Sequence, residues 1–130
     1  MRLAWLALAI AFPWNLAAQS AALGSCGSDS TAADIRKCAA REYEQAQRDL
    51  KRYVAEARRL ATKPRLLDSA QAVWERFRDL ACRAAGSQAE DAHEQPTVVL
   101  TCLANATRKR AHELYNDFLK RARSALPEPQ

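Results

Sequence analysis

Apolar residues recur at steps of three and four along the segment that follows residue 30, and charged residues fill the positions between them. This spacing gives one apolar stripe along the side of a helix. The stripe consists of Ile35, Ala39, Tyr43, Ala46, Leu50, Tyr53, Ala57 and Leu60. Thr31, followed three residues later by Asp34, forms a loose capping box of the kind that begins a helix. The pattern predicts a helix from about Thr31 to Ala61.

Two further segments show the same helical spacing. Pro64 suits the first turn of a helix, where its missing N–H costs nothing, and Gly86 suits a helix end. Pro96 opens the next segment in the same way, and the proline-rich sequence after Leu126 cannot continue a helix. The apolar positions are Leu67, Ala70, Trp74, Phe77, Ala81 and Ala84 in the second segment and Val99, Leu103, Ala106, Leu114 and Phe118 in the third.

The connections between the three predicted helices are short, so consecutive helices should run antiparallel. We therefore predict an all-α fold, a three-helix antiparallel bundle with a long first helix and with Trp74 in its core. The bundle should form one helical domain over residues 31–124. Residues 21–30 are expected to be an irregular lead-in, and residues 125–130 a disordered tail.

The first 20 residues have the organisation of an export signal. Arg2 precedes an apolar run from Leu3 to Phe12, and Ala18-Gln19-Ser20 fits the small-x-small pattern of a cleavage site. The run is shorter than the roughly 20 apolar residues that a membrane anchor needs. We predict a signal peptide over residues 1–20 and a protein that is periplasmic or secreted.

Four cysteines follow this segment: Cys26, Cys38, Cys82 and Cys102. An even count in a short exported chain predicts two disulfides, because the compartment beyond the membrane is oxidising. Disulfides of this kind typically contribute about 2–4 kcal/mol each. The sequence Leu23-Gly24-Ser25-Cys26 is also a passable lipidation motif. Lipidation of Cys26 would leave an odd number of thiols, so a lipoprotein anchored there, and hence held at the membrane, is the alternative.

The charge and the residue types exclude several classes of function. The chain has 20 basic and 15 acidic side chains, a net charge of +5, which weakly favours anionic partners. Acids interrupt the basic faces at nearly every turn, so we expect no nucleic-acid binding. The two histidines and four cysteines lack the spacing of a zinc site, and neither a nucleophile–base pair nor a glycine-rich phosphate loop occurs. We therefore expect no metal, no cofactor and no catalytic residue, and the chain is not expected to be an enzyme.

The most distinctive cluster lies in the second predicted helix. Gln71, Trp74, Arg78 and Cys82 follow one another at steps of three, four and four, which places them on one side of a helix. A tryptophan beside an arginine suggests a guanidinium packed against an indole ring. Large aromatic residues at such positions usually belong to the core. We interpret Trp74 as a core anchor and Arg78 as a half-buried, ion-paired residue, with a binding role as the alternative.

The same residues carry a resemblance to the lysozyme-inhibitor LprI family of bacterial exported helical proteins. The second-helix signature A-Q-x-x-W-x-x-[FY]-R-D-x-x-C is matched by Ala70, Gln71, Trp74, Phe77, Arg78, Asp79 and Cys82. The first-helix pattern is matched by Cys38, Ala39, Tyr43, Ala46, Leu50 and Tyr53. The closing pattern C, T-x-x-R-x-x-x-L is matched by Cys102, Thr107, Arg110 and Leu114. The chain departs from the family at Gln47, where aspartate is usual, and at Lys51, where asparagine is usual.

The resemblance implies an exported protein that binds a lysozyme or another envelope protein. The signature residues are then expected to be mostly structural: Gln71, Trp74, Arg78, Asp79, Thr107 and Arg110. Four cysteines allow three pairings, and sequence alone cannot choose among them. We predict Cys26–Cys38 and Cys82–Cys102, because these pairs are closest in sequence and related chains often carry only one of them.

A partner-binding segment is expected between the second and third helices. Glu90, Asp91 and Glu94 form the one concentrated acidic patch of a basic chain, on a loop that a Cys82–Cys102 bond would anchor. Since lysozymes are commonly basic, this loop is the part best suited to approach one. The alternative is a non-inhibitory envelope module, interacting or structural, that binds an anionic polymer or a protein.

Overall fold

The computed structural model describes Cys26 and residues 31–130, and this part of the chain is helical without any strand. The expected signal peptide and most of the lead-in lie outside the described residues. Three long helices account for most of the described residues, and a π-helical turn followed by a short helix extends the third long helix. They are α2 (Ala32–Leu60), α3 (Pro64–Gly86), α4 (Gln95–Leu114), η2 (Tyr115–Leu119) and α5 (Lys120–Ala122).

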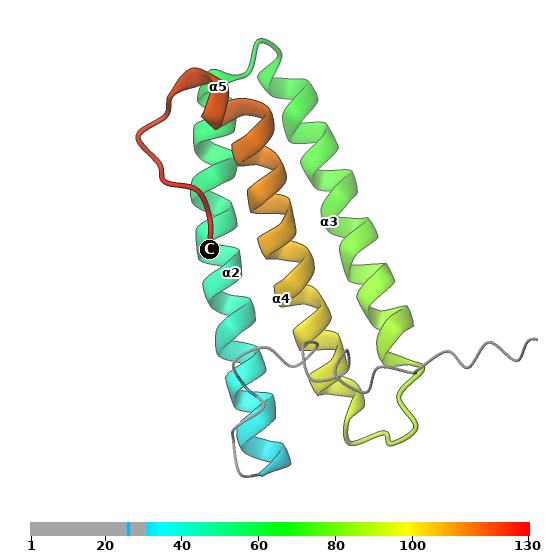
Figure 1. The fold of residues 1–130 in the computed structure, drawn as a ribbon. Helices are drawn as coiled ribbons and strands as arrows, with labels where there is room; N and C mark the ends of the chain where they lie inside the picture. Colours follow the sequence, from blue (N-terminus) through cyan, green and yellow to red (C-terminus); the bar gives the residue numbers. More distant parts are fainter. Residues whose placement is uncertain (1–25, 27–30) are drawn as a thin grey trace, which may run out of the picture.

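Consecutive helices run in opposite directions, so α2 and α4 point the same way and α3 runs against them (Figure 1). Helix α4 packs along α2 and also along α3, whereas α2 and α3 touch each other little. The prediction of three helices and no strand is confirmed for the described residues. At 29 residues, α2 is the longest single α-helix, but α4 continues through η2 and α5 as far as Ala122.

The helix ends follow the sequence signals. Thr31 caps α2, because its hydroxyl oxygen accepts a hydrogen bond from the Asp34 backbone N–H at 3.1 Å. Prolines occupy the first turns of α3 and α4, as predicted. Gly86, at the end of α3, allows close approach of α4, since an added Cβ would lie only 2.4 Å from Val99 Cγ2. None of the described helices has the length and apolar composition that crossing a membrane requires.

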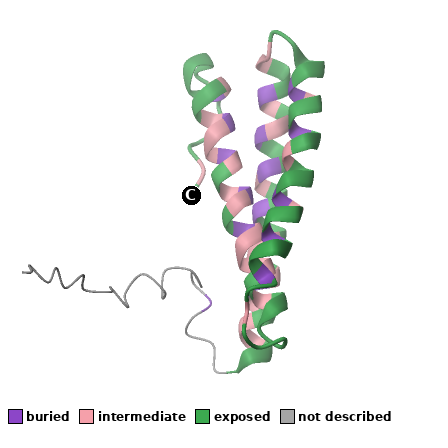
Figure 2. Cartoon of the chain, turned by 90° about the vertical axis from the view of Figure 1, so that its right-hand side faces the viewer, coloured by how far each residue is buried: buried purple, intermediate pink, exposed green. Residues whose placement is uncertain are grey.

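The main apolar core cluster lies in the half of the bundle near the α2–α3 connection. Buried residues continue along the inner sides of the helices (Figure 2). The buried members of the core cluster come from all three long helices and η2: Leu50, Tyr53, Ala57, Leu67, Ala111, Leu114 and Leu119. The predicted stripe of α2 is confirmed, since five of its positions are buried. On α4 the prediction is confirmed at Leu114, which is buried. The other buried residues of α4 were not predicted, namely Ala104, Thr107 and Ala111. Val99, Leu103 and Ala106, and Phe118 in η2, are only partly buried.

The other half of the bundle is held by the two disulfides. Cys26 is bonded to Cys38 with a Cα–Cα distance of 5.7 Å, and Cys82 to Cys102 with 5.5 Å. The predicted pairing is therefore the one found. Both Cys26 and Cys82 are buried, and the bonds hold together a part of the bundle that lies outside the main apolar core cluster.

The predicted inner face of α3 is wrong except at Leu67, which is buried. Phe77 is 67% exposed, and Ala70, Ala81 and Ala84 are exposed with it. Trp74 is only partly buried, at the edge of the core rather than within it. The reason is geometric: Cys82 must face Cys102, and residues on the same side of the helix turn inward with it. Those residues are Leu67, Gln71, Arg78, Cys82 and Gly86.

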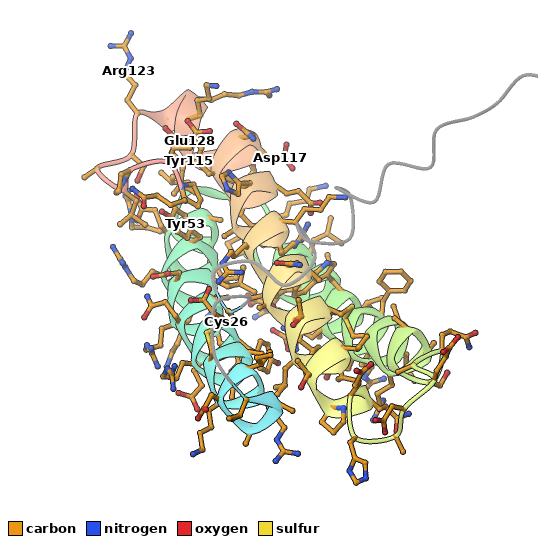
Figure 3. The ribbon with its side chains drawn as sticks, turned by 60° about the horizontal axis from the view of Figure 1, so that its bottom comes forward. Cys26, Tyr53, Tyr115, Asp117, Arg123 and Glu128 are labelled. Carbon is orange, nitrogen blue, oxygen red and sulfur yellow. A yellow bond between two sulfur atoms is a disulfide. The ribbon has the colours of Figure 1, made fainter. Side chains whose placement is uncertain are left out.

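Residues 124–130, which include the segment 125–130 where we expected a disordered tail, form no helix and fold back along α2 (Figures 1 and 3). The hydroxyl of Tyr53 donates a hydrogen bond to the Pro127 carbonyl oxygen at 2.8 Å, and Leu126 packs against the core. Ser124 Oγ donates to Glu56 Oε1 at 2.8 Å. These contacts tie the C-terminal segment to the second half of α2.

The Glu56 contact should make stability depend on pH. Hydrogen bonds from Arg59 and then Ser124 lower the pKa of Glu56 from about 4.5 to about 2. A carboxylate with a lowered pKa stabilises the fold above its unfolded pKa, and this contribution is lost as the pH falls from about 4.5 towards 2. Glu56→Gln should therefore lower the melting temperature at pH 6 to 7, and the difference from the parent should shrink on acidification. A difference that is constant down to pH 2.5 would contradict the contact.

Candidate functional site

The family-signature residues meet at the middle of the bundle, between the apolar core and the Cys82–Cys102 bond. They come from all three long helices, and we call them the Arg78 cluster: Tyr43, Gln71, Trp74, Arg78, Asp79, Thr107 and Arg110. Sequence reasoning placed three of the α3 members, Gln71, Trp74 and Arg78, on one side of a helix. The structure brings them to one place.

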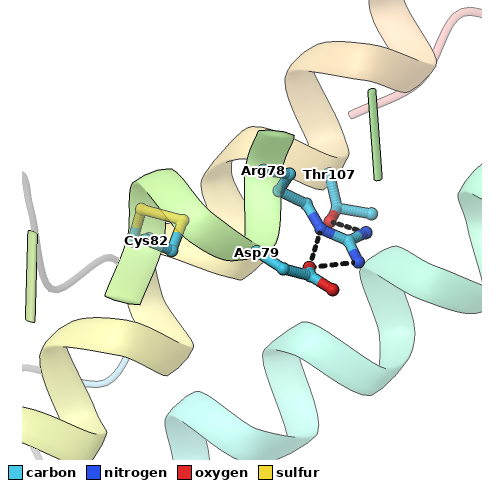
Figure 4. The surroundings of a disulfide bond; sticks show 5 residues. Arg78, Asp79, Cys82 and Thr107 are labelled. Atoms are coloured by element: carbon cyan, nitrogen blue, oxygen red, sulfur yellow. Dashed lines mark hydrogen bonds and ion pairs between the residues drawn. A yellow bond between two sulfur atoms is a disulfide. The ribbon is translucent and has the colours of Figure 1, made fainter. Parts of the chain in front are cut away.

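Arg78 is the centre of this cluster and is only 8% exposed (Figure 4). Its Nε and one terminal nitrogen donate to Asp79 Oδ1 at 2.9 and 2.7 Å, and the other terminal nitrogen donates to Thr107 Oγ1 at 3.3 Å. The guanidinium also lies over two aromatic rings, 5.1 Å from the Trp74 centroid and 5.6 Å from that of Tyr43. Hydrogen bonds, a neighbouring carboxylate and two ring faces together offset the cost of burying the charge.

Trp74 contacts a second guanidinium. Arg110 lies 5.7 Å from the Trp74 ring centroid, and its Nε donates to Gln71 Oε1 at 3.1 Å. Arg110 also forms an ion pair with Glu113 at 3.0 Å. The Nε of Arg110 and one of its terminal nitrogens therefore both have partners inside the protein. The indole therefore joins α3 to α4 through its contact with Arg110, and it also packs against the apolar core.

The pKa of one cluster member is perturbed. Burial raises the pKa of the Tyr43 hydroxyl, and the nearby Arg78 charge opposes this effect. Tyr43 is therefore neutral at physiological pH, and its ring is available to the guanidinium as a neutral π face. The described residues hold no group of three His, Cys, Asp or Glu side chains that could bind a metal ion.

A groove of about 380 Å³ runs beside the cluster between α2 and α3. Its polar lining consists of Gln47, Lys51, Gln71, Glu75 and Arg78. Gln71 and Arg78 are already engaged with Arg110, Asp79 and Thr107. The Gln71 and Arg78 side chains that line the groove are therefore not free to bind a ligand, because their polar groups are hydrogen-bonded within the cluster.

The acidic loop lies at the end of the bundle opposite the α2–α3 connection. Glu90, Asp91 and Glu94 are exposed, and none of them forms an ion pair with another described residue. Asp91 Oδ1 accepts a hydrogen bond from the His93 backbone N–H at 2.8 Å, which orders the turn. The Cys82–Cys102 bond joins the two helices that the loop connects.

A hollow of about 290 Å³ adjoins this loop and was not predicted from the sequence. Ile35 from the start of α2 and Val98 from the start of α4 provide its apolar lining, and Asp91 and Glu94 lie beside them. We call this surface the acidic end: the loop acids together with this hollow. Its apolar part was missed because Ile35 and Val98 are 63 positions apart in the chain and meet only because α2 and α4 begin at the same end.

One ion pair between two helices could not be predicted from the sequence. Arg108 on α4 contacts Glu42 on α2. Both residues belong to helix faces that are rich in charge, where most such residues are solvated. Tyr43 was predicted to lie on the apolar stripe of the first helix, but its contact with Arg78 was not predicted.

The planar guanidinium of Arg78, which donates to both Asp79 and Thr107, should make this residue irreplaceable by lysine. Lysine keeps the charge but loses the planar fork and the stacking on two rings. Arg78→Lys should lower the free energy of unfolding by about 1–3 kcal/mol, because the Thr107 hydroxyl and the ring faces lose their partner. Arg76→Lys is the matched control on the exposed side of the same helix, with an expected change within about 0.5 kcal/mol. Equal urea midpoints for the two variants would remove Arg78 from its structural role.

A comparison of the chain with known protein families gives a match. The model of the family described as "Lysozyme inhibitor LprI" matches residues 24–114, which include all four cysteines and every residue of the Arg78 cluster. Neither the curated proteins nor the solved structures gave a match to the chain. The family match covers well over half of the chain, and it agrees with the resemblance found in the sequence motifs. The chain belongs to the LprI family of lysozyme inhibitors.

Proposed function

We propose that this protein is an exported inhibitor that binds a lysozyme by protein–protein contact, without metal or cofactor. The observation that carries the proposal is the family match over residues 24–114. The family is one of inhibitors rather than enzymes. Two disulfides, Cys26–Cys38 and Cys82–Cys102, support a place outside the cytoplasm, where such bonds persist.

The pairing of Cys26 bears on how the protein is held in the envelope. Its sulfur is bonded to Cys38 and is therefore engaged in the fold. This bond supports a periplasmic or secreted protein over a lipoprotein anchored at Cys26, because lipidation would need that sulfur.

We assign the lysozyme contact to the acidic end. Its three loop carboxylates have no ion-pair partner among the described residues, so their charge is available to a basic protein. The hollow beside them offers Ile35 and Val98 as apolar contact area. The disulfide that joins α3 to α4 limits the motion of the loop and lowers the ordering cost of binding.

A second candidate function is that of a non-inhibitory envelope module. The observation that favours it is the net charge of +5, which opposes long-range attraction to a basic lysozyme. Its partner would be an anionic polymer or a protein. Inhibition assays against several lysozyme classes separate the two functions directly.

Neutralising the loop tests the assigned surface. The variant Glu90→Gln, Asp91→Asn, Glu94→Gln keeps side-chain size and leaves an oxygen to accept the His93 N–H. We expect association with the lysozyme to slow by about tenfold at low salt, with a smaller effect at 0.15 M, where charges are screened beyond roughly 8 Å. Surface plasmon resonance at two salt concentrations would measure both rates.

The control variant removes three exposed acids elsewhere: Glu44→Gln, Asp117→Asn, Glu128→Gln. It should leave association within about twofold of the parent, because its charges lie far from the acidic end. Unchanged binding by the loop variant would move the contact to another surface. A parent protein that inhibits no lysozyme would favour the envelope-module function.

A further inference from the structure

Helix α3 exposes four large apolar residues, of which the sequence pattern placed only Phe77 on the inner face. Leu66, Val73, Phe77 and Leu80 are 62–68% exposed. They follow one another at steps of seven, four and three, so they form one line along the outer side of the helix. We call this line the α3 outer stripe. Contiguous exposed apolar surface of this kind marks an interaction site in a soluble domain.

A row of arginines borders the stripe on one side. Arg65, Arg76 and Arg83 are exposed and are separated by steps of eleven and seven, which keeps them on one flank of α3. Within the described part of the chain none of these guanidiniums forms an ion pair. Their charges are therefore free for an external partner.

The acids of α3 lie on the opposite side of the helix. Asp68 pairs with Arg58 of α2 at 3.1 Å, and Asp79 pairs with the buried Arg78 at 2.7 Å. Glu75 accepts a hydrogen bond from Gln71 at 3.4 Å. Apolar and basic groups thus share the outer side of α3, and no acid of this helix offsets them there.

A hollow of about 560 Å³ extends the apolar surface beside the first half of α3. Leu66, Leu67, Ala70 and Phe118 line it, together with the polar residues Lys63, Arg110 and Asp117. The outer side of α3 therefore combines a ridge of exposed side chains with an adjoining recess.

A second copy of the chain packed antiparallel on this stripe is a poor occupant. Two such stripes packed antiparallel about a two-fold axis would bring like flanks together, because that axis keeps each flank on its own side. Six arginines would then line one edge of the interface without an acid to pair them, which is unfavourable. A basic lysozyme is opposed by the same charges.

We propose that the α3 outer stripe binds the surface of a membrane that contains anionic phospholipid. An interfacial helix buries its apolar side at the headgroup–acyl boundary while arginines on its flank contact lipid phosphates. The straight outer ridge of one helix suits a flat surface, and the unpaired arginines suit an anionic one. This surface is distinct from the acidic end, and it requires no lipid on Cys26.

Vesicle sedimentation tests the proposal on the exported protein recovered from the periplasm of a producing bacterium. The parent should sediment with phosphatidylglycerol–phosphatidylcholine vesicles and at least tenfold less with phosphatidylcholine alone. Val73→Gln, Phe77→Gln, Leu80→Gln should abolish sedimentation. Arg65→Gln, Arg76→Gln, Arg83→Gln should weaken it by about tenfold at 0.1 M salt and leave the residual binding nearly independent of salt.

The matched control removes three basic charges from α2: Arg36→Gln, Lys37→Gln, Arg41→Gln. It should bind within about twofold of the parent, and circular dichroism should show a folded protein for each variant. Equal loss in the α2 control, equal binding to neutral vesicles, or no binding by the parent would overturn the proposal. If the parent does not bind vesicles and the Val73→Gln, Phe77→Gln, Leu80→Gln variant loses lysozyme inhibition, the stripe is a protein-docking surface instead. The acidic-loop variant should sediment like the parent, so a failure of the proposed lysozyme contact would be seen separately.

Discussion

The rotation of α3 about its own axis is set by the bond between Cys82 and Cys102, and most other features of the structure depend on it. The bond turns one side of α3 towards α4, and Gln71 and Arg78 turn inward with it. Burying a guanidinium requires partners, which Asp79, Thr107 and the two aromatic rings provide. The opposite side of the helix, with its larger apolar residues, is left at the surface. The buried polar contacts of Arg78 and the exposed apolar residues of α3 thus both result from the Cys82–Cys102 bond.

This arrangement divides the surface by charge. The loop acids gather with an apolar hollow at the end where α2 and α4 begin, whereas α3 presents unpaired arginines beside an apolar line. A protein with a modest net charge therefore offers two surfaces of opposite character. The proposed lysozyme contact uses the acidic end, and the proposed lipid contact uses the α3 outer stripe. Under these two proposals, one molecule binds a basic enzyme and an anionic membrane at the same time.

Sequence reasoning succeeded where local signals and tertiary packing agree. The α2 stripe and the helix starts at Thr31 and the prolines followed from spacing and residue chemistry. The cysteine pairing was predicted from proximity in the sequence together with the resemblance to related chains, and it is the one found. It failed on α3, because hydrophobic periodicity identifies an apolar side but not whether that side is covered. The signature cluster on α3 held the missing information: Gln71, Trp74 and Arg78 share a side with Cys82, which has to face its partner. The acidic end was foreseen only in its loop, since Ile35 and Val98 meet through the fold alone.

The orientation of α3 is tested most directly by two leucine substitutions that remove the same atoms from opposite environments. Leu80 is 62% exposed on α3, and Leu114 is 1% exposed in the core. Urea denaturation should show that Leu114→Ala lowers the free energy of unfolding by about 2–5 kcal/mol, while Leu80→Ala changes it by no more than about 0.5 kcal/mol. A loss of about 2 kcal/mol or more for Leu80→Ala would mean that the apolar side of α3 is buried, and it would contradict the account.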